Sequence, residues 1–178
     1  MLEIVIGPMF SGKSTHALSY VRRMRSIGKD VIIIKPTIDD RYSSDPVLVT
    51  HNNEKYPCLV WDIKERLNNY DDMSHDCYVI EEAHFFEGLY RLCYKLLFKG
   101  KDVLVVGLDG CSSQYKFGEI LNVIPLANSV TKLNALCFRC KDGTLAPYSR
   151  RLTNTTSQVE VGGADKYIAV CLEHLINE

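Results

Sequence analysis

The chain has 178 residues, of which 46% are hydrophobic and 24% charged, and its formal net charge is −1. This length suits one ordinary core with a small appendage, and the charge argues against a protein that grips nucleic acid through a basic surface. The sequence has no apolar run long enough to span a bilayer and no signal-peptide pattern at its N-terminus. With no such signal, the seven cysteines favour a reducing compartment, where metal binding or burial is commoner than disulfide bonding.

The first strong signal in chain order is a phosphate-binding loop over residues 7–14. An apolar stretch over 2–6 leads into Gly-Pro-Met-Phe-Ser-Gly-Lys-Ser, which fits the pattern G-x-x-x-x-G-K-S/T, and a helix is predicted over 13–27. A strand that turns sharply into a helix directs backbone N–H groups and the positive end of the helix dipole at one point. Lys13 can then reach the β- and γ-phosphates of a nucleoside triphosphate, and Ser14 can bind Mg²⁺. A glycine-rich turn without a ligand is the alternative.

The residues up to about 128 alternate strand and helix signals. Buried strands are predicted over 31–34, 77–80 and 103–106, and apolar residues at helical spacing predict a helix over 88–99. Such alternation implies an α/β fold, a mostly parallel sheet with helices on its faces. The polar segment 41–57 is predicted to be a mobile loop or lid near the phosphate site.

Two acids, Glu81 and Glu82, end the predicted strand over 77–80. In phosphate-loop proteins an acid at this position commonly holds Mg²⁺, and the neighbouring acid can accept a proton from an attacking hydroxyl. A solvated acidic turn is the alternative. Arg41 could stabilise charge on a transferred phosphoryl group, although a surface ion pair would explain this arginine equally well.

Aromatic residues and glycines outside the phosphate loop indicate a site for a nucleobase. The pair Phe85-Phe86, with Phe117 and Tyr167, could hold a flat ring, although a single aromatic residue is more often part of a core. The pair Gly162-Gly163 would let backbone groups approach the edge of a flat ligand.

After residue 128 the pattern changes, and we expect a small second domain over 129–178 beside a nucleotide-binding domain over 1–128. Short β-prone pieces alternate with turn residues there, and about fifty residues build little core alone. The motifs Cys137-x-x-Cys140 and Cys171-x-x-His174 can together supply four ligands to a structural Zn²⁺. Two unrelated thiol clusters are the alternative, because the gap between the motifs is long. The other cysteines are predicted to be buried: Cys58, Cys77, Cys93 and Cys111.

Together these features resemble the type II, cellular-type thymidine kinases. The resemblance runs nearly end to end. It rests on 7–15, Asp39-Asp40-Arg41-Tyr42-Ser43-Ser44, Glu81-Glu82-Ala83-His84-Phe85-Phe86, Leu108-Asp109-Gly110, Phe117-Gly118, Ile120-Leu121-Asn122, Pro125-Leu126-Ala127, both cysteine motifs and Gly162-Gly163-Ala164-Asp165-Lys166-Tyr167. It implies a P-loop NTPase-like fold with a small zinc-binding lasso domain. It also implies transfer of the γ-phosphate of ATP, with Mg²⁺, to the 5′-hydroxyl of thymidine, with deoxyuridine left open as a second substrate.

The resemblance further implies roles for individual residues. Glu82 would be the catalytic base, Arg41 and Lys13 would act on phosphate, and Glu81 and Ser14 would serve Mg²⁺. The residues that would bind ATP are Gly7, Met9, Phe10, Ser11, Gly12, Lys13, Ser14 and Thr15. The thymine pocket would be formed by Met9, Phe85, Leu108, Phe117 and Tyr167, with Val159, Val161 and Gly162 in the lasso loop. A cytoplasmic homotetramer is implied, with dTTP as feedback inhibitor and no nucleic-acid or membrane partner.

The chain departs from the family pattern around its acids. The family usually reads Asp-Glu-x-Gln-Phe, whereas this chain has Glu81 in place of the Asp and His84 in place of the Gln. Residues 111–115 lack the aromatic residue that often follows Asp-Gly, and the stretch before Gly162 is one residue shorter than in some relatives. Two other classes stay open. Glu81 favours a non-catalytic nucleotide-binding protein, and the zinc motifs permit an NTPase acting on nucleic acid, which the near-neutral charge opposes.

Overall fold

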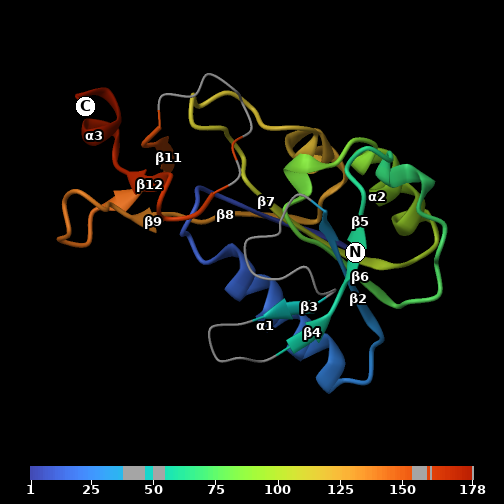
Figure 1. Ribbon diagram of the computed structural model, residues 1–178. Helices are drawn as coiled ribbons and strands as arrows, with labels where there is room; N and C mark the ends of the chain where they lie inside the picture. The colour runs from blue at the N-terminus through green and yellow to red at the C-terminus, as the bar shows by residue number, and fades with distance from the viewer. Residues whose placement is uncertain (38–46, 50–54, 154–159, 161, 178) are drawn as a thin grey trace.

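The computed structural model describes residues 1–37, 47–49, 55–153, 160 and 162–177. Its centre is a six-stranded sheet in the order β5-β2-β6-β7-β1-β8 (Figure 1). Every neighbouring pair in this sheet is parallel, which confirms the predicted α/β class. Its strands are β1 (Leu2–Ile6), β2 (Val31–Pro36), β5 (Leu59–Trp61), β6 (Cys77–Ile80), β7 (Asp102–Gly107) and β8 (Ser129–Lys132).

Two helices cover opposite faces of this sheet because its strands are apolar on both sides. Helix α1 (Lys13–Ser26) packs over the face that carries Val5, and α2 (Leu89–Phe98) over the face that carries Ile4. Three 3₁₀ turns join the layers: η1 (Leu67–Asn69), η2 (Ala83–Phe85) and η3 (Ile120–Leu126). The predicted helices over 13–27 and 88–99 are therefore confirmed, with their ends shifted by about a residue.

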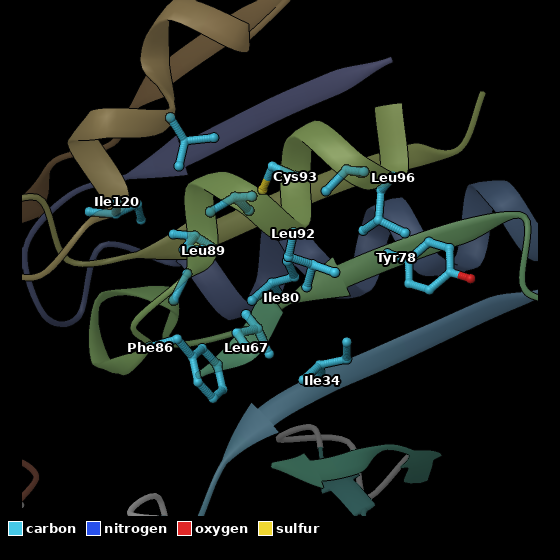
Figure 2. Close-up of a cluster of buried hydrophobic side chains, with 14 of the residues drawn as sticks. Ile34, Leu67, Tyr78, Ile80, Phe86, Leu89, Leu92, Cys93, Leu96 and Ile120 are labelled. Carbon is cyan, nitrogen blue, oxygen red and sulfur yellow. The ribbon is translucent and has the colours of Figure 1, made fainter. Parts of the chain in front are cut away.

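The larger core lies between α2 and the sheet. Figure 2 shows the side chains of Leu89, Leu92 and Leu96 on the side of α2 that faces β6, the strand of Ile80. All four are fully buried. Burial of such a side chain contributes roughly 1.5–3 kcal/mol, so this layer holds the carboxyl end of β6, and with it the two acids, in a fixed position.

The segment predicted as a mobile loop or lid is partly strand. Residues 47–49 form β3 (Val47–Val49), which pairs antiparallel with β4 (Lys55–Pro57). Tyr56 of β4 anchors this hairpin on α1, because its hydroxyl accepts a 2.9 Å hydrogen bond from Arg22 Nε and its ring lies 5.6 Å from the Arg25 guanidinium. The loop prediction is therefore wrong for these strands. Its remaining residues lie outside the described part of the chain.

The small domain lies at the left of Figure 1, and its elements are β9 (Ala135–Leu136), β10 (Leu145–Ala146), β11 (Tyr148–Arg151), β12 (Tyr167–Val170) and α3 (Leu172–Ile176). Strands β9 and β10 pair antiparallel, as do β11 and β12. Its core is small, as expected for so few residues. The division into domains at residue 128 stays a prediction, but β8, which follows that point, pairs with β1 and so belongs to the large sheet.

Candidate active site

The phosphate loop connects β1 to α1, as the sequence predicts. Gly7 has a φ of +150°, and a Cβ at this position would collide with the carbonyl oxygen of Leu133, so glycine is required. Gly12 precedes the helix with a φ of +82°, and its carbonyl accepts a 3.0 Å bond from the His16 N–H. The first N–H groups of an α-helix lack partners within the helix, which makes the start of α1 suitable for phosphate.

Within the loop, two side chains converge on one carbonyl. Ser11 Oγ donates to the Pro8 oxygen at 2.8 Å, and Lys13 Nζ donates to the same oxygen at 2.6 Å. An ammonium has three donors, so the contact with Pro8 is compatible with binding to phosphate oxygens. Ser14 and Thr15 are exposed in the first turn of α1, where a hydroxyl is accessible to a metal ion or a phosphate.

The phosphate loop is also tied to the small domain. The Met9 N–H donates a 2.9 Å hydrogen bond to Oγ of Ser149, a buried residue of β11. The two residues are 140 positions apart in the sequence. Nothing in the residues around Ser149 indicates a contact with the phosphate loop, so Ser149 was not predicted as a site residue.

Removing this hydroxyl should loosen the loop. Ser149→Ala leaves a partly buried N–H without its acceptor, which costs about 1–3 kcal/mol, and we expect a lower free energy of unfolding and a higher KM for ATP. Urea unfolding and steady-state kinetics measure both. Ser129→Ala, at an exposed position of β8, is the control and should change neither. Unchanged stability and KM in Ser149→Ala would show that the bond does not position the loop.

Glu81 and Glu82 lie at the carboxyl end of β6, as predicted. Glu81 is 3% exposed, and its N–H donates to the Ile34 carbonyl of β2 at 2.9 Å. Glu82 has a left-handed backbone, with φ 49° and ψ 40°, and its side chain is 19% exposed. A left-handed backbone costs a residue other than glycine about 1–3 kcal/mol. This backbone conformation ends the strand abruptly, and the side chains after Ile80 no longer alternate between the two faces of the sheet.

Three further charged residues lie at this edge of the sheet and were not predicted as site residues: Lys35, Asp109 and Lys132. Lys35 of β2 is only 5% exposed and follows Ile34, which pairs with Ile80 in the parallel register. Continuing that register places Lys35 beside Glu81, on the same face. A lysine is rarely buried unless paired, so the lysine that ends the β-branched run over 31–34 was the available signal.

Asp109 and Lys132 form an ion pair that joins the ends of two strands. The Asp109 carboxylate, after β7, lies 2.7 Å from Lys132 Nζ of β8. Because β1 lies between β7 and β8, this pair crosses the strand that leads into the phosphate loop. The position of Asp109 after a buried strand is the same signal that identified Glu81.

Three residues predicted for the base pocket cluster around His84. The rings of Phe85 and Phe117 lie 5.5 Å apart and edge to face, and each lies within 4.5 Å of the His84 ring, measured between centroids. The Leu108 N–H donates to His84 Nδ1 at 3.0 Å. The prediction that Phe86 also holds a base is not supported, because Phe86 is 1% exposed and packs in the core beneath α2 (Figure 2).

Tyr167 lies at the base of the segment predicted as a lasso. Its hydroxyl donates to the Glu160 carbonyl at 2.7 Å and accepts from Arg151 Nη2 at 3.2 Å. The Glu160 carboxylate is bound by Arg151 at 3.6 Å and by Lys166 at 3.3 Å, which fixes this end of the segment. Gly162 lies against the Lys166 side chain. The other predicted residues lie outside the described part of the chain: Arg41, Val159 and Val161.

The two cysteine motifs come together as predicted. One ligand atom from each of Cys137, Cys140, Cys171 and His174 lies within 4.8 Å of the others. His174 Nδ1 is 3.3–3.8 Å from the three sulfur atoms, and the Cys140 and Cys171 sulfurs are 3.8 Å apart. Tetrahedral zinc with ordinary bond lengths requires S···S of roughly 3.8 Å and S···N of roughly 3.6 Å. The cluster therefore fits Zn²⁺, and its four ligands leave no position for catalysis.

Backbone donors lower the pKa of two of the three thiols, whereas burial and hydrogen bonds with the other two sulfurs raise the pKa of Cys140 to about 11. Burial raises the pKa of Cys137, but N–H groups of Cys140, Cys171 and Arg139 lower it to about 6. Hydrogen bonds from the His174 backbone and ring lower the pKa of Cys171. The thiolate is the form that binds metal. The remaining cysteines, Cys58, Cys77, Cys93 and Cys111, are buried outside the cluster, as predicted.

Comparison with known proteins identifies the family. A family model described as thymidine kinase matches residues 1–175. The chain belongs to the thymidine kinase family. It is 40% identical over 184 residues to a thymidine kinase of Oryza sativa subsp. japonica, and 39% identical over 182 residues to thymidine kinase a of Arabidopsis thaliana. It is 39% identical over 175 residues to the cytosolic thymidine kinase of Homo sapiens.

These matches cover 99%, 98% and 96% of the chain, and 66%, 74% and 70% of the respective relatives. The resemblance seen in the sequence is therefore confirmed, together with thymidine kinase function and the class of ATP-dependent phosphotransferase. The alternative of an NTPase acting on nucleic acid loses its support. Across the described residues, no helix combines the length and apolar character needed to cross a membrane.

Proposed function

We propose that the chain transfers the γ-phosphate of ATP to the 5′-hydroxyl of thymidine, with Glu82 as the base. The observation that carries this proposal is the common edge of the sheet. The phosphate loop follows β1 and Glu82 follows β6, and only β7 separates the two strands. Adjacent strands are about 4.8 Å apart, so the ends of β1 and β6 lie roughly 10 Å from each other, which leaves room for the acceptor hydroxyl between the loop and the base.

Each residue has a role in this scheme. The loop over 7–15 holds the ATP phosphates through its N–H groups, and Lys13 balances charge on the β- and γ-phosphates. Glu82 accepts the proton as the hydroxyl attacks phosphorus and the bond to the β-phosphate oxygen breaks. Arg41 stabilises the charge on the transferred group. The proposed walls of the thymine site are Met9, Phe85, Leu108, Phe117, Val159, Val161, Gly162 and Tyr167.

Mg²⁺ is proposed to be held by Ser14 and Glu81. The buried carboxylate of Glu81 and the exposed hydroxyl of Ser14 are oxygen donors of the kind Mg²⁺ prefers. The ion would neutralise charge on the β- and γ-phosphates when bound. The buried Lys35 beside Glu81 supports a charged role for this carboxylate, because a buried acid without a compensating charge is costly.

Glu81 can be tested separately from the base. We expect Glu81→Ala to lower activity and raise the Mg²⁺ concentration needed for half-maximal rate, whereas Glu81→Asp, which restores the residue usual in the family, should be tolerated. Mg²⁺ titrations of initial rate measure this. Glu65→Ala, at an exposed position after β5, is the control. A Mg²⁺ titration that is the same in Glu81→Ala and the parent would refute the assignment.

The remaining properties are proposals from the family resemblance. We expect Zn²⁺ as a structural ion at Cys137, Cys140, Cys171 and His174, a homotetramer, inhibition by dTTP and a cytoplasmic location. The human relative is named as cytosolic, which supports that location. Neither nucleic acid nor membrane is expected as a partner, in agreement with the net charge of −1.

One assay tests the proposed function against its alternatives. The protein is mixed with γ-labelled ATP, Mg²⁺ and each nucleoside in turn, and the products are resolved. Labelled thymidine monophosphate is the expected result, with deoxyuridine as the nearest competitor. Binding of ATP without any monophosphate would indicate a non-catalytic nucleotide-binding protein. ATP hydrolysis that depends on added nucleic acid rather than on a nucleoside would also overturn the proposal.

A further inference from the structure

His84 lies where it can act on the catalytic base. It belongs to the turn η2 that follows Glu82 directly, and its side chain is 1% exposed. The rings of Phe85 and Phe117 pack on it. Gly107 lies so close that a Cβ there would come within 2.9 Å of His84 Nδ1. The imidazole is therefore held in one orientation by its surroundings.

The hydrogen bond from the backbone defines which nitrogen of His84 carries the proton. Leu108 N lies 3.0 Å from Nδ1, and a backbone N–H can only donate. Nδ1 is therefore an acceptor, and in the neutral ring the proton lies on Nε2. This contact alone fixes the tautomer of His84.

The protonated nitrogen faces the base. Nε2 of His84 lies 3.5 Å from Oε2 of Glu82, with N–H on one side and a carboxylate on the other. This separation is long for a hydrogen bond, but catalytic contacts without substrate are often long and shorten in the reactive complex. Glu82 also has a strained left-handed backbone, and such a residue persists only when its surroundings hold it.

We propose that His84 is a positioning residue for the reaction. Its Nε2–H orients the Glu82 carboxylate toward the 5′-hydroxyl of the nucleoside, and its Nδ1 fixes the same ring to the Leu108 backbone. The inference rests on the proposed role of Glu82. It gives the histidine that replaces the usual glutamine of the family a definite function, because a glutamine side chain also offers an acceptor and an N–H donor.

Two variants of His84 separate the hydrogen bond to Leu108 from the contact with Glu82, and a variant of another histidine serves as the control. In His84→Asn, Oδ1 can replace Nδ1 as acceptor for Leu108, but the side chain is too short to reach Glu82. In His84→Gln, the amide N–H can replace the donor to Glu82. We expect His84→Asn to lower kcat by about 10–100-fold, the worth of a hydrogen bond to a charged group, with a much smaller change in the KM for thymidine. His84→Gln should recover most of kcat. The control His75→Asn changes a partly buried histidine before β6 that contacts Asp30 and Asp72, and its kcat should match that of the parent.

The outcomes distinguish this inference from the proposed function. In the Glu82→Gln background, adding His84→Asn should change kcat little further, because His84 acts through that carboxylate. Equal losses of kcat in the Asn and Gln variants, full additivity with Glu82→Gln, or a rise in KM alone would overturn the inference. If Glu82→Gln itself turns over normally, the assignment of Glu82 as the base fails instead. Nitrogen-15 NMR of the His84 ring needs no variant, and a proton on Nδ1 rather than Nε2 would also overturn it.

Discussion

Glu82→Gln should lower kcat by about 10²–10⁴-fold, the usual worth of a positioned general base, while thymidine still binds. The glutamine is nearly the same size and shape but cannot accept the proton of the 5′-hydroxyl. Glu82 lies at the carboxyl end of β6, where its backbone is left-handed and its side chain is mostly buried. The loss should therefore fall on the chemical step and not on the fold. Single-turnover kinetics with thymidine binding measured by calorimetry test both parts.

Glu87, which follows the turn η2, provides a matched control for Glu82. Glu87 has a side chain that is 72% exposed and forms a 3.6 Å surface ion pair with Arg66, so Glu87→Gln should leave kcat unchanged. Surface pairs of this kind contribute little to stability. Near-normal turnover in Glu82→Gln, beside a normal control, would move the role of base to another residue at this edge of the sheet.

The α/β core could be predicted because its signals are local. Strands such as Val31–Pro36 begin as β-branched runs, and helix α2 carries apolar residues at a helical period. The membership of β8 in the sheet was not predictable in this way, because all four of its residues are exposed and lack an apolar pattern. The hairpin of β3 and β4 was missed because polar residues surround two strands of three residues each.

The same division holds for the site. The phosphate loop, the acids after β6 and the cysteine motifs are short runs whose spacing states their chemistry. The contacts that hold these groups join distant residues: Met9 with Ser149, Asp109 with Lys132, and Leu108 with His84. Such pairings depend on strand order and register, which a single sequence does not display.

The second large effect is expected when one ligand of the metal cluster is replaced. Cys171→Ser should lose the metal, because a serine hydroxyl is a poor replacement for a thiolate in a four-ligand zinc site. Structural zinc can supply about 10–16 kcal/mol of apparent binding energy in a small module, and the core of this domain consists largely of alanine, cysteine and a few aliphatic residues. We therefore expect one zinc per chain to fall toward none, and the melting temperature to fall with it.

The loss of metal should reach the active site by two routes of unequal strength. Strands β11 and β12 carry the base of the lasso segment, where Tyr167 and Glu160 are held, so the KM for thymidine should rise most. The phosphate loop belongs to the large sheet, so ATP binding should weaken less than thymidine binding. Some loss of ATP affinity is still expected, because Met9 of the loop is hydrogen-bonded to Ser149 of β11. Cys58→Ser changes a thiol outside the cluster and should keep its zinc. Elemental analysis and kinetics of the two variants provide the measurement, and active purified protein with well under one zinc per chain would refute the structural role of the ion.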